Sequence, residues 1–478
     1  MKPLTSLYSL RYPGTIIYML QSCEYRAIPY LRWLWRTRDF STVSNRGHLK
    51  RTRYARLLLV LLVAGIAIEV AAGLSLIVLG IVDGLAGYWA FGAAVIVAYP
   101  IIWPHLIVLP LELGRLYVVE PKQEGEVRRS ADIFSAHSAV KIAVAGSYGK
   151  TTMKEVLNTV LSEGKRVAAT EANHNVAIEH AKFAHRLEGN EEVLIIEYGE
   201  GAPGDVRKFS ANTHPTHGII TGLAPAHLDS YKTMEAAAAD IFSLGEYLKG
   251  KNVYVNADSK AASEHIGEGY VRYGESGAGK WKATDISVSA SGLKFKLKNG
   301  KRTLELESHM LGRHQVGTLS LAALLGLELG LSEAQVKAGI ANTAPFEHRM
   351  QPYQLGGALI IDDTYNGNID GVRAGTRLLA ELSSKRKIYV TPGLVEQGNE
   401  TESVHTEMGR LIAGSEPNIV VLMNNSVTEY IRNGLEESSY AGELRIEDKP
   451  LEFYRNLEHF VAAGDTVMMQ NDWPDNYS

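Results

Sequence analysis

The apolar run from Leu57 to Val82 constrains the fold of this chain most, because Glu69 is the only charged residue in it. A second apolar run extends from about Tyr88 to Leu113 and contains three prolines, at 100, 104 and 110, which kink or break a helix. Each run is long enough to cross a lipid bilayer. We therefore expect residues 57–118 to form a two-helix transmembrane hairpin, with Glu69 packed against the second span. A buried core hairpin is the alternative.

The distribution of charge gives the hairpin an orientation. Residues 1–56 carry 11 Lys and Arg against two acidic residues, and the rest of the chain carries 38 basic and 51 acidic residues. Lys and Arg are absent from 57–114 and present on both flanks, so the positive-inside rule places the N-terminus and the body in the cytoplasm. We expect a cell-membrane protein with two spans, whose residues 1–56 form a basic interfacial segment on anionic lipid. The acidic body argues against nucleic-acid binding.

After a polar linker at 119–138, the body alternates strand-like and helix-like segments. Strands are predicted at 140–145, 166–169, 193–197, 217–221 and 252–256, with helices at 150–163, 176–187 and 233–248. Residues 268–310 read as a small β subdomain, followed by a helix at about 315–330. Near Pro345 the pattern restarts, with strands near 358–362, 387–391, 418–422 and 466–470. The predicted fold class is α/β, with a P-loop-type central domain at 139–344 built on a mostly parallel sheet, and a smaller Rossmann-like domain at 345–478.

A glycine turn follows the first predicted strand of the body. Residues 146–152 read Gly146-Ser147-Tyr148-Gly149-Lys150-Thr151-Thr152 and lead into a predicted helix. Strand, glycine turn and helix N-terminus together direct backbone N–H groups onto phosphate oxygens. Lys150 can neutralise the β- and γ-phosphates, and the Thr151 hydroxyl can join a Mg²⁺ shell. Valine occupies position 144, where the full P-loop pattern has glycine, so an ordinary turn is the alternative to an ATP site.

Several further motifs follow in a fixed order along the body. They are Ile196-Glu197 through Asp205, Thr221 through Leu228 with His227, Val255-Asn256-Ala-Asp258, Leu311-Gly-Arg-His314, Glu347-His-Arg349, and Ile361-Asp362-Asp363-Thr-Tyr365-Asn366-Gly-Asn368. With the glycine turn, this ordered set resembles the Mur ligase family over roughly residues 140–478. It is most similar to the type that adds D-alanyl-D-alanine to a UDP-muramoyl-tripeptide.

The resemblance implies an ATP-dependent peptide ligase. Such enzymes phosphorylate a carboxylate with ATP, and an amine then attacks the acyl phosphate, so cations and Mg²⁺ must neutralise the developing charge. By resemblance, the catalytic residues are Lys150, His227 and Arg349, and the metal ligands are Thr151, Glu197 and His227. The implied nucleotide contacts are residues 146–152 with Asn256, His314, Arg349, Asp363 and Tyr365. Thr170, Asn173 and Asn175 match a substrate-side loop. Helix capping is the alternative role for Glu197.

Three departures from the family pattern bear on this chemistry. No lysine occurs between Lys232 and Lys249, where the family carries one that is carbamylated to bridge metals; Ala238 takes its position, and Asp240 lies on a different helix face. Gln315 and Thr318 replace asparagines near the adenine. The family's N-terminal domain, which grips the UDP-sugar, has no room between the second apolar run and the strand at 140, where only about 26 residues lie.

Together these features predict a membrane-anchored, ATP-dependent ligase of peptidoglycan precursor synthesis, which joins a muropeptide carboxylate to an amino acid or to D-Ala-D-Ala. Two alternatives remain: a non-catalytic nucleotide-binding scaffold at the membrane, and a Mur-like ligase with a folate or polymer acceptor. A membrane tether raises the effective concentration of anything anchored in the same leaflet. We therefore expect a lipid-linked muropeptide as substrate, with a soluble precursor as the alternative.

Overall fold

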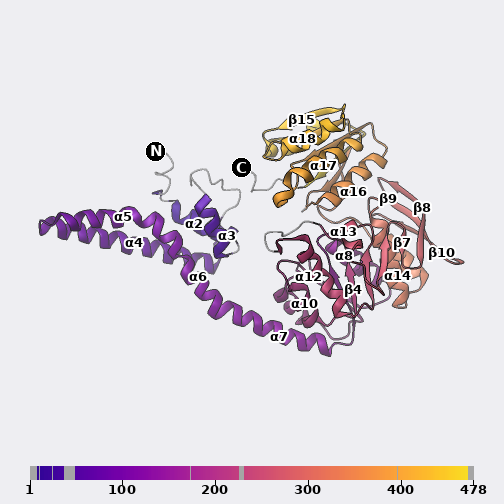
Figure 1. Cartoon of the computed structure of the whole chain (residues 1–478), viewed down its shortest axis with the longest axis horizontal. Coiled ribbons are helices and arrows are strands. Elements are labelled where there is room, and N and C mark those ends of the chain that lie inside the picture. The colour runs from indigo at the N-terminus through magenta and orange to yellow at the C-terminus, as the bar shows by residue number, and fades with distance from the viewer. Residues whose placement is uncertain are drawn as a thin grey trace. The chain divides into compact units, whose positions relative to one another are not determined.

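Two structural units make up the chain in this computed structural model, Met1–Gly125 and Glu126–Ser478 (Figure 1). The structure describes residues 8–9, 11–23, 25–36, 49–172, 174–224, 231–365, 367–395 and 397–471. Each unit has hydrophobic cores of its own.

The first unit is helical in its described part. Its elements are α2 (Tyr12–Ser22), α3 (Ala27–Arg36), α4 (Arg53–Val82), α5 (Ala86–Leu106), α6 (Val108–Gly114), the π-helical turn η1 (Arg115–Val119) and the beginning of α7 (Glu120–Ala136). The long helices α4 and α5 lie side by side. Helix α5 continues through its first two prolines, so they do not end it. The segment predicted as a polar linker, 119–138, is largely helical because α7 occupies most of it.

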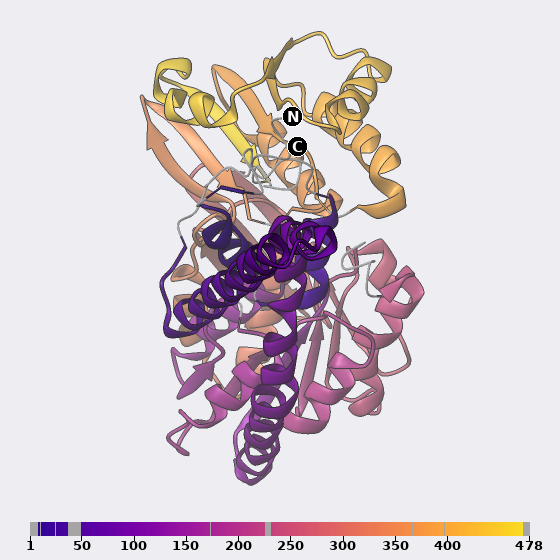
Figure 2. The same ribbon diagram turned by 90° about the vertical axis from the view of Figure 1, so that its left-hand side faces the viewer.

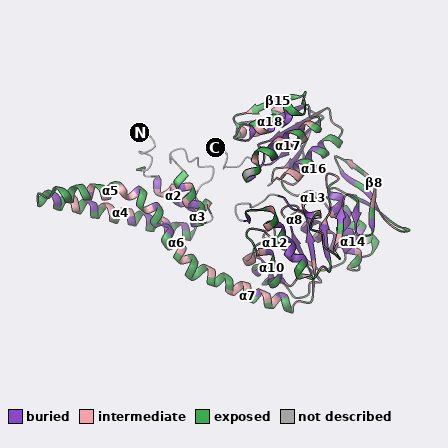
Figure 3. Ribbon diagram, viewed as in Figure 1, coloured by how far each residue is buried: buried purple, intermediate pink, exposed green. Residues whose placement is uncertain are grey.

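Close packing of α4 against α5 depends on glycine. A Cβ at Gly73 would stand 2.8 Å from the carbonyl oxygen of Gly92, so a larger residue would force the helices apart. The indole Nε1 of Trp103 donates a hydrogen bond to Glu69 Oε2, which confirms that Glu69 packs against the second apolar helix. Large apolar side chains of α4 and α5 stay exposed, Ile68 by 71%. Figure 3 colours many residues of both helices as exposed. By length and composition alone, two helices of this unit could cross a membrane.

Helices α2 and α3 pack onto the proline-containing end of α5. Pro104 has no N–H, so the carbonyl of Pro100 lacks its usual helical donor. The Tyr12 hydroxyl donates to this carbonyl at 2.5 Å, and the Tyr30 hydroxyl donates to the carbonyl of Pro104 at 3.0 Å. Both tyrosines are buried, together with Ile16. Part of the predicted interfacial segment is therefore an integral part of the helical unit.

A ten-stranded sheet, in the order β10-β9-β8-β7-β6-β5-β4-β1-β3-β2, begins the second unit. Its parallel strands are β1 (Val140–Ala145), β2 (Val167–Ala169), β3 (Val193–Glu197), β4 (His217–Ile220), β5 (Val253–Asn256) and β6 (Val271–Gly274). Its antiparallel strands are β7 (Gly277–Ala278), β8 (Trp281–Ser289), β9 (Gly292–Asn299) and β10 (Arg302–Ser308). The predicted β subdomain at 268–310 is thus an extension of the central sheet.

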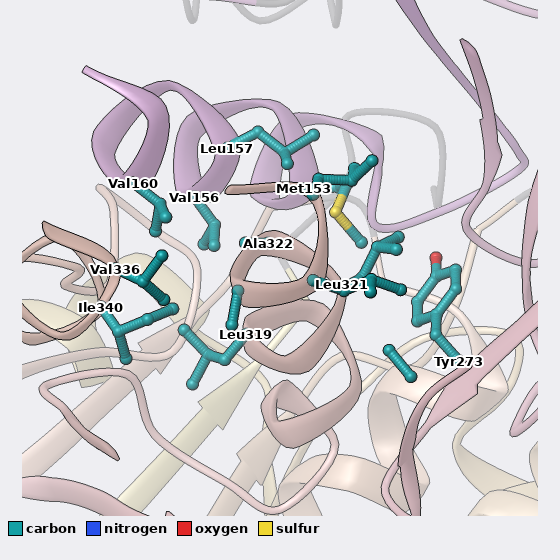
Figure 4. Packing of buried hydrophobic residues seen from close by; sticks show 14 of the residues in the cluster. Met153, Val156, Leu157, Val160, Tyr273, Leu319, Leu321, Ala322, Val336 and Ile340 are labelled. Atoms are coloured by element: carbon teal, nitrogen blue, oxygen red, sulfur yellow. The ribbon is translucent and has the colours of Figure 1, made fainter. Parts of the chain in front are cut away.

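Helices cover both faces of this sheet (Figures 1 and 2). One face carries α8 (Lys150–Leu161), α14 (Gln315–Glu328) and α15 (Glu333–Ala341), and the other carries α9 (Ala177–Ala184), α10 (Asp205–Thr213), α12 (Met234–Tyr247) and α13 (Lys260–Ser263). Along β1, Ile142 and Val144 enter one core and Ala143 and Ala145 enter the other, as expected for a sheet buried on both sides. Figure 4 shows α8 packed through its apolar side chains against α14 and α15.

The second sheet has the order β11-β12-β16-β13-β14-β15 and is parallel except for β11. Its strands are β11 (Gln351–Leu355), β12 (Ala358–Asp363), β13 (Arg386–Thr391), β14 (Ile419–Met423), β15 (Glu443–Glu447) and β16 (Asp465–Gln470). One face packs on α16 (Ile369–Glu381), α17 (Thr401–Gly414) and α18 (Thr428–Glu437), and the other on α19 (Pro450–Arg455) and α20 (Leu457–Phe460); a 3-10 turn η2 (Gly398–Glu400) precedes α17. The predicted α/β class is confirmed.

Candidate functional site

The glycine turn leaves the carboxyl end of β1 and begins α8, as the sequence predicts. Gly146 has φ 136° and Gly149 has φ 75°, which residues with a Cβ rarely adopt. A Cβ at Gly146 would also collide with the side chain of Thr221, which follows β4. The Thr221 hydroxyl donates a hydrogen bond to the carbonyl of Tyr148. Thr221 therefore stabilises the turn, which precedes the N-terminus of α8, where an anion can bind.

Lys150, the first residue of α8, forms an ion pair with Glu200. Its Nζ lies 2.7 Å from Glu200 Oε2, and the two side chains are only 12% and 4% exposed. Nζ also donates to the carbonyl of Gly146 at 2.5 Å, and the Ser147 N–H donates to the carbonyl of Gly222 at 2.9 Å. Glu200 was not predicted as a site residue, although it stands three residues after Glu197 in the same motif. A phosphate at the turn would compete with this carboxylate for the ammonium.

Glu197 ends β3 and is buried, with 1% exposure. Its Oε1 accepts hydrogen bonds from Thr151 Oγ1 at 3.2 Å and from Asn175 Nδ2 at 3.3 Å. Its Oε2 has no hydrogen bond within the described chain, and the Lys154 ammonium lies 3.4 Å from it. The capping alternative is wrong, because the hydrogen bonds of the Glu197 carboxylate come from the Thr151 and Asn175 side chains and none comes from a backbone N–H of the described helix α10. A carboxylate with a free lone pair beside a threonine hydroxyl fits Mg²⁺, which takes few protein oxygens and keeps water and phosphate ligands.

The predicted second metal site is not supported by the residues that the structure describes. His227 lies outside them, as does Asn173 of the substrate-side loop. Asp240 cannot replace the missing lysine, since Oδ2 accepts from the Tyr231 hydroxyl at 2.8 Å and Oδ1 accepts from Gly204 N–H at 2.9 Å. Burial raises the pKa of this carboxyl. Ala238 is buried in the core, and no group of three His, Cys, Asp or Glu in the described ranges could hold a metal ion.

A cavity of about 460 Å³ opens beside the glycine turn, between the two sheets of the second unit. Five nucleotide-contact residues implied by the resemblance line it together: Asn256, His314, Arg349, Asp363 and Tyr365. Tyr148, Gly149 and Thr152 of the turn line it as well, and so do Gln315 and Thr318. Its volume is in the range of small-molecule sites. Residues more than 200 positions apart in the sequence are thus brought into one cavity that reaches the phosphate-binding turn.

A basic side chain, Arg349, and an acidic side chain, Asp363, both line the cavity. The Arg349 guanidinium lies 4.4 Å from the centre of the Tyr365 ring, and this cation–π contact orients the planar guanidinium. Asp363 accepts hydrogen bonds from Met350 N–H at 3.2 Å and from Gln470 Nε2 at 2.7 Å. Burial nevertheless raises the pKa of Asp363 to about 7.

At the rim of the cavity, ion pairs join the part of the second unit that carries the ten-stranded sheet to the part that carries the six-stranded sheet. Both terminal nitrogens of Arg377 contact Glu275, at 2.6 and 3.0 Å. Arg313 pairs with Glu381 at 2.7 Å. Glu275, Arg313 and Arg377 all line the cavity. None of these residues was predicted, because a pair separated by 102 residues leaves no signal in a single sequence.

Comparisons with known proteins agree with this geometry. Residues 144–326 match the Mur ligase middle domain. The UDP-N-acetylmuramoyl-tripeptide–D-alanyl-D-alanine ligase of Escherichia coli K12 is 28% identical over 279 residues, which cover 56% of this chain and 61% of that protein. The ligase of the same name from Mycobacterium leprae is 26% identical over 438 residues, which cover 81% of this chain and 84% of that protein. The chain thus spans about three fifths of the length of the E. coli relative.

Among solved structures, MurF ligase from Thermotoga maritima in complex with ADP gives a TM-score of 0.64 at 18% identity, covering 73% of this chain and 80% of that one. An identity this low shows the fold alone. Residues 144–326 thus match the Mur ligase middle domain, and the relatives named above and this solved structure of similar fold are Mur ligases. The relatives to which the chain is similar are ligases of the MurF type, which add D-alanyl-D-alanine.

Proposed function

We propose that this protein is a membrane-anchored, ATP-dependent amide ligase that extends a muropeptide during peptidoglycan precursor synthesis. The cavity beside the glycine turn carries the proposal, because it joins a helix N-terminus to polar residues of a second domain. The relatives' names state that they act on UDP-N-acetylmuramoyl-tripeptide and D-alanyl-D-alanine. Their sequence similarity to this chain supports the same class of substrates here.

In this proposal, the nucleoside of ATP occupies the cavity and its phosphates lie on residues 146–152. Lys150 and Arg349 neutralise the phosphates, and Arg349 can do so through two parallel hydrogen bonds. Thr151 and Glu197 would hold Mg²⁺, which supplies charge neutralisation at the transferring phosphoryl group when bound. The domain at 139–344 would bind ATP, and the domain at 345–478 would close over it.

The proposed chemistry has two balanced steps. A carboxylate oxygen of the muropeptide attacks the γ-phosphorus, the bond from that phosphorus to the β,γ-bridging oxygen breaks, and ADP leaves. The amine of the incoming amino acid or dipeptide then attacks the acyl carbon, inorganic phosphate leaves with the oxygen of the former carboxylate, and the amine loses a proton. A carboxylate labelled with ¹⁸O should therefore transfer one ¹⁸O atom to phosphate. Unlabelled phosphate formed together with ligated product would refute the acyl phosphate.

The membrane part of the proposal rests on α4 and α5, whose outer faces expose apolar side chains (Figure 3). Both flanks of the hairpin are proposed to be cytoplasmic, with the turn at Asp83 outside. The chain has a single cysteine, Cys23, so topology can be mapped in a Cys23→Ser background. We expect Asp83→Cys to react with an impermeant maleimide in intact spheroplasts, whereas a cysteine at Ser439 should react only after lysis. The reverse pattern, or reaction of both, would refute this topology.

A lipid-linked muropeptide is the proposed acceptor. We expect the full chain in lipid nanodiscs to ligate D-alanyl-D-alanine onto a polyprenyl-pyrophosphate-linked muropeptide faster than onto the soluble UDP-linked form at equal concentration. The unit Glu126–Ser478, which has its own cores, should bind ADP and lose this preference. A full chain that prefers the UDP-linked form would overturn the lipid-linked part.

A non-catalytic scaffold is the second candidate. Both carboxylate oxygens of Asp240 already accept hydrogen bonds, so no described group takes the place of the family's carbamylated lysine. This observation favours the scaffold. Tight ATP binding without ADP formation, in the presence of both acceptor forms and the dipeptide, would support the scaffold.

A further inference from the structure

Lys154, on the second turn of α8, is a fully buried cation. A buried ammonium group is costly unless it is paired and hydrogen-bonded. Its Nζ donates to the carbonyl of Thr170 at 2.8 Å and to the carbonyl of Ala172, and it lies 3.4 Å from Glu197 Oε2. A second carboxylate oxygen, Glu155 Oε1, lies at 3.3 Å. Lys154 thus touches both the proposed Mg²⁺ carboxylate and the backbone that follows β2.

Further bonds tie these two parts together on either side of Lys154. The Glu197 N–H donates to Thr170 Oγ1 at 3.1 Å. Asn175 Nδ2 donates to Glu197 Oε1 at 3.3 Å, and the carbonyl of Asn175 accepts from Gly199 N–H at 2.8 Å. Thr170 and Asn175 are therefore hydrogen-bonded to the end of β3, and Asn175 also to the Glu197 carboxylate itself.

The backbone near Lys154 is also strained. Ala172 has φ 42°, in the left-handed region where a Cβ is unfavourable. Its carbonyl is one of the two that accept from Lys154 Nζ. The buried ammonium is thus hydrogen-bonded to a backbone position in a conformation that an alanine does not prefer.

We propose that Lys154 is a positioning residue that couples occupancy of the Mg²⁺ site to the segment between β2 and α9. This inference rests on the proposed function, since Glu197 must hold Mg²⁺. A cation bound at Glu197 competes with the hydrogen bonds that Oε1 accepts from Thr151 and Asn175 and withdraws charge from Oε2. The ammonium then interacts more strongly with the carbonyls of Thr170 and Ala172.

Hydrogen exchange in full-length protein tests the coupling without any turnover. Exchange of the peptide spanning residues 168–178 is measured in saturating ADP, with and without Mg²⁺, for the parent protein, Lys154→Gln and Lys141→Gln. Lys141 is the matched control because its Nζ is also buried and donates only to backbone carbonyls, those of His137 at 2.7 Å and Ala139 at 3.5 Å. The binding of Mg²⁺ and ADP to the same three proteins is measured by isothermal titration calorimetry.

We expect Mg²⁺ to slow exchange in this peptide at least threefold in the parent and in Lys141→Gln, and to have no effect in Lys154→Gln. Removing a positive charge beside Glu197 should also tighten Mg²⁺ binding severalfold, whereas general destabilisation would weaken it. Retained coupling in Lys154→Gln overturns the inference, and so does Mg·ADP binding to the parent without a change in exchange. If Lys154→Gln does not fold, the absence of a Mg²⁺ effect on exchange in the parent still overturns the inference. A parent that binds no Mg·ADP overturns the proposed function itself.

Discussion

Replacing Glu200 with Gln should tighten nucleotide binding. In the structure, Glu200 pairs with Lys150 at 2.7 Å with little exposure on either side, so a nucleotide phosphate must displace it. A hydrogen bond between charged groups contributes about 1.5–3 kcal/mol. Gln keeps the shape and a neutral hydrogen bond and removes the charge, so the lower end of that range, about 1.5 kcal/mol, applies. Since 1.4 kcal/mol is a factor of ten, the Kd for ADP should fall about tenfold.

Isothermal titration calorimetry with ADP and Mg²⁺ measures this effect. Glu307→Gln is the matched control, because Glu307 pairs with Lys294 at a similar distance of 2.8 Å but with both side chains 66% exposed. It should leave the Kd unchanged, as exposed pairs contribute little. An unchanged or raised Kd for Glu200→Gln would refute the view that Lys150 binds the nucleotide phosphates and that Glu200 competes with them for its ammonium group.

Three further predictions concern the cavity and its rim. Arg377→Met should raise the Kd for ADP a few-fold at low salt and hardly at all in 0.5 M NaCl, because Arg377 is half exposed in its pair with Glu275 and salt screens such a pair. Arg410→Met, which breaks a pair between α17 and α18, should not change the Kd, and equal effects of the two variants would contradict a role of Arg377 in closing the cavity. Asp363 has a folded pKa of about 7, above its ordinary value of 3.8, so the stability it contributes is present below about pH 4 and lost as the pH rises through 7. The melting temperature of Asp363→Asn relative to the parent, without nucleotide, should therefore rise from pH 5 to pH 8.5; a constant difference would contradict the raised pKa. Gly146→Ala should abolish ADP binding, whereas Gly330→Ala, at φ 92° with no atom near its Cβ, should only lower the melting temperature.

The order of strands and helices was readable from the sequence because buried parallel strands are short apolar runs between amphipathic helices. The edge strands β11 and β15 escaped prediction, since Gln-Pro-Tyr-Gln-Leu and Glu-Leu-Arg-Ile-Glu carry polar residues on exposed faces. The continuation of the central sheet through β10 could not be predicted either. Which sheet an antiparallel ribbon joins depends on long-range packing, here of Leu293, Phe295 and Leu297 in the core under α14.

For the site, the ordered motifs predicted residues that line the cavity in the structure. The sequence did not identify the charged partners of those residues. Glu200, Lys154 and the pair of Arg377 with Glu275 act through charges placed by tertiary structure, and a lone charged residue in a sequence carries no sign of its partner. The role of His227 stays a prediction, because it lies outside the described residues.

The most direct test of the account is product formation by the full chain in lipid nanodiscs. ATP, Mg²⁺, D-alanyl-D-alanine and a lipid-linked or UDP-linked muropeptide are supplied together, and ADP, phosphate and the ligated muropeptide are quantified by mass spectrometry. The account predicts ADP, phosphate and product in equal amounts, only when all substrates are present, and none of them with Lys150→Ala. ATP consumption without ligated product, or equal product from Lys150→Ala, would contradict it.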